Sequence, residues 1–288
     1  MSLRSLLSGS RLFKVGASIL GVLVVVALLQ PFLNKLLLGD ISPITMGSFR
    51  SYLPPSSEHW LGTDRWGRDW MAQLLLGLRY SLTIGALAGS VATFVAVVLG
   101  FVAGYEGGNV DTTLRTLTDM VLVIPSWPIL VTLAAYIKML SVPVMALLLA
   151  AFSWPWAMRT IRSQVMSLRK QPYVELAKIS DLGDFEIIFQ ELIPNMLPYL
   201  GVGLSYSIVG AILAETGLEL IGLGPGNIVT LGLMTNWAMG WGVLALGKWQ
   251  MVFAPVICLI LIFVSFNLIN MGLEESFNPR LKKVTGAG

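Results

Sequence analysis

Long stretches without a charged residue dominate this sequence. Six of them reach about 18 residues or more, the length that an α-helix needs to cross the hydrocarbon core of a bilayer. They cover residues 15–33, 80–105, 120–137, 139–158, 192–214 and 249–273. The pattern predicts an all-α, polytopic membrane protein with six transmembrane helices.

A seventh uncharged stretch, residues 220–247, is the main alternative to this count. It contains seven glycines together with Pro225, Asn227 and Asn236, a composition that favours a loop with a short or re-entrant helix packed on protein. An even number of spans also keeps the basic residues of both chain ends on the cytoplasmic side, as the positive-inside rule prefers. These basic residues are Arg4, Arg11, Lys14, Arg280, Lys282 and Lys283. We therefore expect six spans with both termini in the cytoplasm.

Composition supports the membrane assignment. Hydrophobic residues make up 55% of the 288 residues and charged residues only 12%, and the mean hydropathy is +0.76. The net charge of +3 fits the positive-inside rule, and no basic tract predicts nucleic-acid binding. The single cysteine, Cys258, lies in an apolar run, which excludes an intramolecular disulfide and a cysteine metal cluster.

Motifs of catalysis are absent from the sequence. There is no Walker A pattern, so the chain has no phosphate cradle with which to use ATP itself. There is also no H-E-x-x-H, no G-x-S-x-G and no paired-cysteine metal motif. We expect no catalytic site, no metal site and no cofactor in this chain.

The longest charged interruption, residues 153–195, carries five basic and five acidic residues. The pair Gln171-Pro172 is expected to stop the helix that leaves the fourth span, and residues 173–180 then form a short helix. The residues 181–183 supply a turn, and Asp184 is the predicted N-cap of a helix over 185–193. Two short amphipathic helices joined by a turn are typical of a docking element for a soluble cytoplasmic partner.

Glycines and prolines within the spans bear on helix packing and transport. Gly85 with Gly89 and Gly100 with Gly104 form two G-x-x-x-G spacings, which let another helix approach closely. Pro125 and Pro128 are expected to bend the third span, either to line a pathway or as a static kink.

Two acidic residues lie at the outer end of the fifth span. Glu215 could face a translocation pathway, tether the outer loop or lie solvated at the interface, and Glu219 follows one turn later.

The predicted extracytoplasmic loop, residues 39–79, contains the only histidine and three closely spaced tryptophans. His59 has no second ligand at metal spacing, which favours a structural role in the loop. Trp60, Trp66 and Trp70 fit an interfacial aromatic belt better than a ligand cage.

The charged stretch also resembles a known motif. Its residues YVELAKISDLGDFEIIFQELIPN are similar to the EAA loop of binding-protein-dependent ABC importer permeases. Leu176 replaces the first alanine of that motif, and Asp181 occupies the usual glycine position, with Gly183 two residues later. The resemblance implies an ATPase-docking role for Tyr173, Glu175, Ala177, Asp181, Gly183, Ile188 and Pro194.

The resemblance extends over nearly the whole chain and points to the dipeptide, oligopeptide and nickel branch of these permeases. The segment LGTDRWGRDW, residues 61–70, is similar to the extracytoplasmic signature of that branch, which here comprises Gly62, Thr63, Asp64, Gly67, Arg68 and Asp69. Further similar positions are Arg115, Asp119, Pro125, residues 154–169, Glu215, residues 222–224 and residues 277–281.

This resemblance implies a type I importer fold and a C-type permease subunit in the cell inner membrane. The expected partners are a second homologous permease, two cytoplasmic ATPase subunits that bind ATP and Mg, an extracytoplasmic solute-binding protein and the lipid bilayer. The expected organisation is a cytoplasmic N-terminus (1–14), a first transmembrane helix (15–38), an extracytoplasmic loop (39–79), a permease core (80–273) with a coupling loop at 159–193, and a cytoplasmic tail (274–288).

The sequence does not decide between several classes of substrate. Oligopeptides are the default for the branch, and small oligosaccharides are the alternative because Trp237 and Trp241 could stack on a sugar. Nickel has the least support, given one histidine and one cysteine.

Two rival functions come from other classes of protein. A self-contained secondary transporter would require paired intramembrane charges or inverted repeats, which the sequence lacks. A membrane scaffold would leave the kinked and glycine-rich spans without a role.

Overall fold

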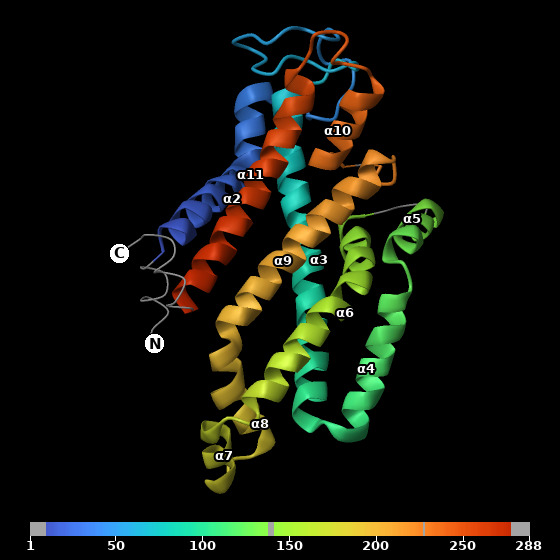
Figure 1. The fold of residues 1–288 in the computed structure, drawn as a ribbon. Helices are drawn as coiled ribbons and strands as arrows, with labels where there is room; N and C mark the ends of the chain where they lie inside the picture. The colour runs from blue at the N-terminus through green and yellow to red at the C-terminus, as the bar shows by residue number, and fades with distance from the viewer. Residues whose placement is uncertain (1–9, 138–140, 227, 278–288) are drawn as a thin grey trace.

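The computed structural model describes residues 10–137, 141–226 and 228–277. In this range the chain is helical, and its one β-bridge joins Thr63 and Asp69 (Figure 1). The elements are α2 (Arg11–Leu38), α3 (Trp70–Glu106), α4 (Gly108–Val123), α5 (Ser126–Tyr136), α6 (Val142–Leu168), α7 (Pro172–Ile179), α8 (Asp184–Glu186), the π-helix η1 (Ile187–Leu192), α9 (Ile193–Leu220), α10 (Leu231–Gly240) and α11 (Gln250–Phe277).

Some predicted features lie outside the described residues. These are Arg4, Asn227, most of the C-terminal motif at 277–281, the basic residues at 280, 282 and 283, and position 139, the predicted start of the fourth span.

The predicted spans appear as long apolar helices. Five helices can cross a membrane by length and composition, and α4 with α5 makes a sixth if this pair, bent by 74°, counts as one span. The predicted bend is confirmed, because Ile124 has an extended backbone before Pro125, the N-cap of α5. Pro128 lies in the first turn of α5, where its missing N–H leaves no hydrogen bond unmade.

One predicted boundary of the outer loop is wrong. Helix α3 begins at Trp70, ten residues before the uncharged run, because Arg79 lies on an exposed face of the helix and donates a hydrogen bond to Gln30 at 2.9 Å. Helix α2 ends at Leu38, as predicted, and Pro31 lies inside it. The loop between these helices is therefore shorter than residues 39–79.

The return to the membrane after the charged segment is also different from the prediction. The second short helix was predicted to end at residue 193, before Pro194, yet the chain is helical without interruption from Asp184 to Leu220. The six residues of η1 widen the helix just before Pro194, which has no N–H to donate. The charged segment is thus joined rigidly to α9.

Helix α3 is the centre of the bundle and lies against α2, α6 and α9 (Figure 1). Its 37 residues extend about 55 Å, well beyond the hydrocarbon core of about 30 Å. Its glycines permit the contacts: a Cβ on Gly89 would meet the backbone of Ile208 in α9 at 2.7 Å, and one on Gly104 would meet the carbonyl of Arg162 in α6 at 2.8 Å. The two predicted glycine pairs therefore face two different helices.

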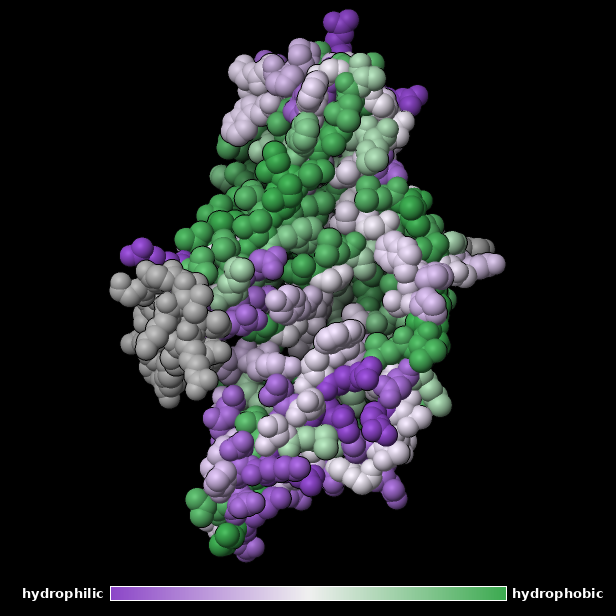
Figure 2. All heavy atoms as spheres, in the orientation of Figure 1, coloured by the Kyte–Doolittle hydropathy of each residue, from purple (hydrophilic) through white to green (hydrophobic). Residues whose placement is uncertain are grey.

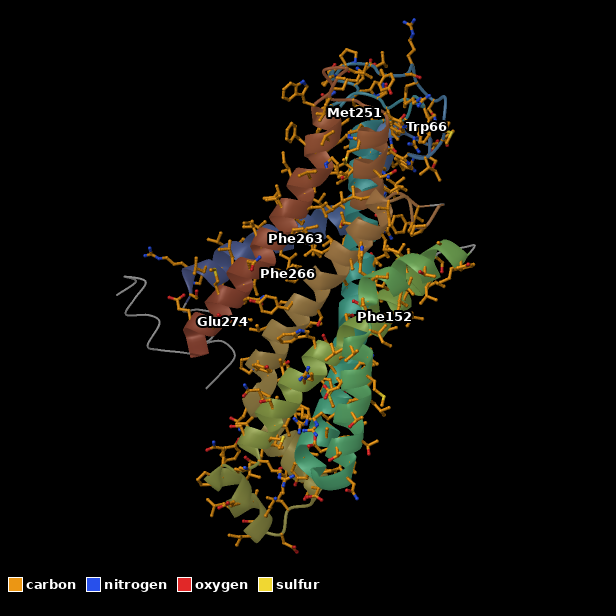
Figure 3. The ribbon with its side chains drawn as sticks, turned by 45° about the vertical axis from the view of Figure 1, so that its right-hand side comes forward. Trp66, Phe152, Met251, Phe263, Phe266 and Glu274 are labelled. Atoms are coloured by element: carbon orange, nitrogen blue, oxygen red, sulfur yellow. The ribbon has the colours of Figure 1, made fainter. Side chains whose placement is uncertain are left out.

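The two ends of the molecule differ in character. Hydrophobic surface covers the upper part over α2 and α11, while the lower end around α7 and α8 is mostly hydrophilic except for a small hydrophobic tip (Figure 2). Figure 3 shows α11 descending from Met251 near the top of the molecule to Glu274, which lies well above the lower end of the molecule.

The contact between α3 and α9 predicts a strong asymmetry between two glycine substitutions. Gly89→Ala should destabilise the protein by about 1–3 kcal/mol, because its Cβ meets backbone atoms that cannot rotate away. Gly201→Ala, on α9 with no atom within 4 Å of the added carbon, should be neutral or stabilising by up to about 1 kcal/mol. Thermal unfolding in detergent checks both, and equal midpoints for the two variants would contradict the packing described.

Candidate functional site

The charged segment contains the predicted first short helix and turn, but its second helix is the start of the long helix that ends at Leu220. Helix α6 ends at Leu168, α7 begins at Pro172 with Gln171 as its N-cap, and α8 follows after the turn at 181–183. The predicted N-cap Asp184 is wrong by one residue. Gly183 is the N-cap, and its backbone N–H donates to the Glu186 carboxylate at 2.9 Å.

The segment from α7 to η1, which we call the docking segment after its predicted role, has a buried face and an exposed face. Val174, Ala177, Ile187 and Leu192 are buried in a cluster with residues of α3 and α6, among them Phe101 and Val165. The opposite face leaves four large apolar side chains exposed. We call them the apolar tip: Leu176 (64% exposed), Ile179 (82%), Phe185 (78%) and Phe189 (62%).

The seven residues of the predicted docking motif divide between these faces. Ala177 is buried, and Tyr173 and Ile188 are half-buried, so these three hold the segment against the bundle. The exposed members are Glu175, Asp181, Gly183 and Pro194. Burial, followed by the Glu191 carboxylate, raises the pKa of Tyr173, whose hydroxyl has no hydrogen-bond partner among the described residues.

The turn explains the glycine of the family motif. Asp181 has a φ of +61°, in the left-handed region that favours glycine, whereas Gly183 has an ordinary φ of −67°. The residue that replaces the usual glycine is therefore the one whose conformation a glycine would suit. Aspartate is among the residues that tolerate this region best.

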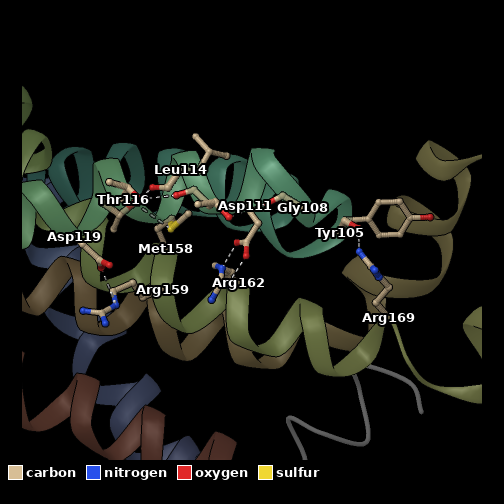
Figure 4. Close-up of polar contacts among 12 residues, drawn as sticks. Tyr105, Gly108, Asp111, Leu114, Thr116, Asp119, Met158, Arg159, Arg162 and Arg169 are labelled. Carbon is tan, nitrogen blue, oxygen red and sulfur yellow. Dashed lines mark hydrogen bonds and ion pairs between the residues drawn. The ribbon is translucent and has the colours of Figure 1, made fainter.

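Ion pairs tie α4 to α6 above the docking segment (Figure 4). Arg162 forms a bidentate contact with the Asp111 carboxylate, and Arg159 lies 3.6 Å from Asp119. Asp119 on α4 thus has its ion-pair partner on α6. The bidentate geometry fixes the angle between the two helices more tightly than a single contact would.

At the opposite end, the extracytoplasmic motif forms a compact knot around Asp64. The Asp64 carboxylate accepts hydrogen bonds from the backbone N–H groups of Trp66 and Arg68, from Arg68 Nε at 2.7 Å and from Gln73 Nε2 at 3.1 Å. Burial lowers the pKa of Arg68, and the charge of Asp64 opposes that shift. Gly67 is required here, because its φ is +70° and a Cβ would meet the Phe49 carbonyl at 2.0 Å.

Other residues of the motif fasten the knot to the start of α3. Asp69 is the N-cap of α3 and accepts from Ala72 N–H at 2.8 Å, while His59 Nδ1 lies 2.7 Å from the Asp69 carboxylate. Thr63 bridges Leu53 N–H and the Arg50 carbonyl. These contacts support the structural role predicted for His59.

The predicted aromatic belt is only partly correct. Trp60 is exposed, but Trp66 and Trp70 pack edge-on against Trp241, and Trp66 also meets Trp237. The Arg68 guanidinium lies 4.4 Å from the Trp66 ring and 4.5 Å from the Trp237 ring. Trp237 and Trp241, which had suggested sugar stacking, are thus committed to contacts with the knot.

Two buried carboxylates, those of Glu215 and Glu219, hold helix α10 against the bundle. Because both side chains are buried, the interpretation that they are solvated at the membrane interface is wrong. Glu219 accepts from the Thr230 hydroxyl and from Leu233 N–H, in the first turn of α10. Glu215 accepts from Ser81 Oγ at 3.2 Å, and Ser81 Oγ accepts from Leu231 N–H at 3.1 Å. The two residues tether the outer segment to α3 and α9, as expected for a loop with a short packed helix.

A groove of about 500 Å³ opens on one side of the bundle, between α6 and α9. Three large aromatic side chains line it, Trp156, Tyr199 and Tyr206, and its hydroxyl groups come from Thr93, Ser153, Thr160 and Ser207. A second hollow of about 480 Å³ shares Trp156, Thr160 and Tyr199 and continues to Arg159 and Gln164.

The predicted pathway residues Pro125, Pro128 and Glu215 do not line this groove. The groove residues were missed, although Tyr199, Gly203, Tyr206 and Gly210 follow helical spacing along one face of α9. Such spacing identifies a face but does not show what covers it.

Comparison with known proteins identifies a family that matches the chain and individual proteins that are similar to it. The family described as "Binding-protein-dependent transport system inner membrane component" matches residues 96–283. The chain is 33% identical over 259 residues to the oligopeptide transport system permease protein OppC of Mycobacterium tuberculosis, covering 88% of each chain. It is 29% identical over 278 residues to the dipeptide transport system permease protein DppC of Bacillus subtilis, covering 96% of this chain and 84% of the relative.

The turn between α7 and α8 predicts opposite effects for two substitutions of one residue. Asp181→Gly should strengthen the turn, and Asp181→Val should weaken it by about 1–2 kcal/mol, because a β-branched residue is strained at positive φ. Hydrogen exchange of the amides at 180–187 measures this. Gly183→Ala is the control, since the added carbon lies 3.7 Å from the nearest atom; stronger exchange in that variant than in Asp181→Val would contradict the assignment.

The buried carboxylate of Glu219 makes a second prediction. Glu219→Leu leaves the Thr230 hydroxyl and Leu233 N–H without their acceptor, which should cost about 1–3 kcal/mol and release α10. Glu219→Gln keeps an acceptor oxygen and should hold α10 in place. Amide exchange over 231–240 compares the two, and unchanged protection in Glu219→Leu would show that the tether is unnecessary.

Proposed function

Because the chain belongs to the binding-protein-dependent transport system inner membrane components, as an ABC importer permease of the dipeptide and oligopeptide family, we propose that it forms half of a translocation pathway for peptides delivered by a solute-binding protein. The other half is a second homologous permease. Two cytoplasmic ATPase subunits bind ATP and Mg, and this chain holds no cofactor and no catalytic residue of its own.

The observation that carries this proposal is the apolar tip. Four large apolar side chains stand exposed at the hydrophilic end of the molecule, where lipid cannot cover them. Exposed apolar clusters rimmed by polar residues mark sites of protein association. The buried face of the same segment packs against α3 and α6, so a partner that grips the tip can move the bundle.

The orientation in the cell inner membrane follows from the same proposal. The apolar tip faces the cytoplasm, and the knot around Asp64 faces outward with the signature residues Gly62, Thr63, Gly67, Arg68 and Asp69. The hydrogen bond from Ser10 to Glu275, 2.7 Å long, joins the start of α2 to the end of α11 and supports termini on one side. That side is the cytoplasmic one, in agreement with the basic residues near both ends.

Transport requires the tip and the groove to be connected. Closure of the ATPases displaces α7 and α8, and the helix that runs without interruption from Asp184 to Leu220 carries the motion through the membrane. Its outer end holds α10 through Glu215 and Glu219. The groove beside α9, with Trp156, Tyr199 and Tyr206, is our candidate lining of the pathway; Pro125 and Pro128 permit the bend of the neighbouring span.

Co-purification with a charged tip tests the proposal. The tagged wild-type chain should bring down the second permease and both ATPases, and Ile179→Asp should lose the ATPases because a charge replaces an apolar contact at the interface. Met46→Asp is the matched control, since Met46 is 61% exposed on the outer loop. Uptake by the chain alone would instead favour a secondary transporter, and retention of both ATPases by Ile179→Asp would refute docking at the tip.

A further inference from the structure

Tyr105, in the last turn of α3, contacts three parts of the segment that begins at the end of α6. Its hydroxyl donates to Asp184 Oδ1 at 2.6 Å, and its backbone carbonyl accepts from the Arg169 guanidinium. Its ring lies 5.7 Å from Lys178 Nζ. Arg169 is the C-cap of α6, Lys178 is in the last turn of α7 and Asp184 is the first residue of α8. Figure 4 shows Tyr105 and Arg169 facing one another.

The hydroxyl bond to Asp184 differs in kind from the other contacts of the docking segment. Within the described residues it is the one side-chain hydrogen bond that joins α7, α8 or η1 to α3, α4 or α6. Apart from the Lys178 ammonium group beside the Tyr105 ring, the contacts given for this segment are apolar and come from residues such as Val174 and Ile187. Apolar contacts hold two surfaces together without direction, whereas a hydrogen bond has a preferred length and angle.

The bond acts next to the apolar tip. Asp184 immediately precedes Phe185, which is 78% exposed, and it follows the turn at 181–183. Tyr105 itself is buried, and the Arg169 contact to its carbonyl holds the end of α3 against the end of α6. The Tyr105 hydroxyl is therefore a fixed point from which the direction of α8 is set.

We infer that Tyr105 is a positioning residue of the docking segment, which fixes the orientation of α8 and Phe185 relative to α3 through its hydrogen bond to Asp184. The inference rests on the proposed function of the apolar tip as the ATPase contact. The bond fixes the direction of α8 relative to α3. When the apolar tip is displaced, the bundle therefore moves with it, and α8 does not rotate on the apolar surface against which it packs. Loss of the bond uncouples ATP hydrolysis from transport and leaves the ATPases bound.

The test uses the complete complex of both permeases, both ATPases and the solute-binding protein in liposomes. Tyr105→Phe removes the hydroxyl alone, and we expect peptide transported per ATP hydrolysed to fall by about threefold to tenfold, which corresponds to the net contribution of a typical hydrogen bond. The amount of ATPase that co-purifies should be unchanged. Tyr80→Phe is the matched control, because Tyr80 lies on the same helix and its hydroxyl makes no hydrogen bond within the described residues.

Substitutions of the acceptor complete the experiment. Asp184→Asn keeps an oxygen that can accept from the Tyr105 hydroxyl, so this variant should retain most of the peptide transported per ATP hydrolysed. Asp184→Ala removes the acceptor, so it should lower this ratio as much as Tyr105→Phe does. The double variant Tyr105→Phe/Asp184→Ala should be no worse than either single variant, since both remove the same bond.

Each outcome separates this inference from the proposed function. Wild-type complexes that contain no ATPase, or that transport without ATP, would refute the proposed function and the inference with it. Wild-type complexes that couple normally while Tyr105→Phe keeps the wild-type ratio would refute the inference alone. So would a parallel fall in ATPase content, thermal midpoint and transport in Tyr105→Phe, because that pattern marks a residue needed only for folding.

Discussion

Close contact between α3 and its neighbours is the constraint on which the rest of the structure depends. A helix in lipid gains little from burying one apolar side chain against another, so association needs backbones that approach closely. Gly89 allows this approach to α9 near the middle of the helix, and Gly104 allows it to α6 near the C-terminal end. Because α3 is longer than the membrane is thick, these contacts place its two ends at the bases of the outer knot and the docking segment.

The sequence predicted what depends on neighbouring residues and missed what depends on distant ones. The spans follow from local runs without charge, and the helix pair at α7 and α8 follows from Pro172 and the turn at 181–183. Arg79 was misread as a boundary because the charge is visible in the sequence and its partner Gln30, on another helix, is not. The roles of Glu215 and Tyr105 depend on Ser81 and Asp184, which lie 134 and 79 residues away.

The two ends of the molecule are held together by different kinds of contact. The contacts of the outer knot are directional, because the Asp64 carboxylate accepts from several donors at once and the Arg68 guanidinium lies over the Trp66 and Trp237 rings. The inner end keeps its apolar residues in two layers, one against the bundle and one exposed. A hydrogen-bonded knot at one end and an exposed apolar surface at the other fit the proposed function, in which the solute-binding protein and the ATPases act at opposite ends of the chain.

The pairing of α2 with α11 has a consequence for how the protein is made. Gly16 packs on the backbone at Ser265, and Gly272 packs on Phe13, so α2 and α11, the first and last of the described helices, share a close interface. Ribosomes deliver helices to the membrane in order, N-terminal first. The contacts of α2 with α3, through Asn34 and Gln30, need only residues up to Arg79. The interface of α2 with α11 forms only after α11 has been synthesised.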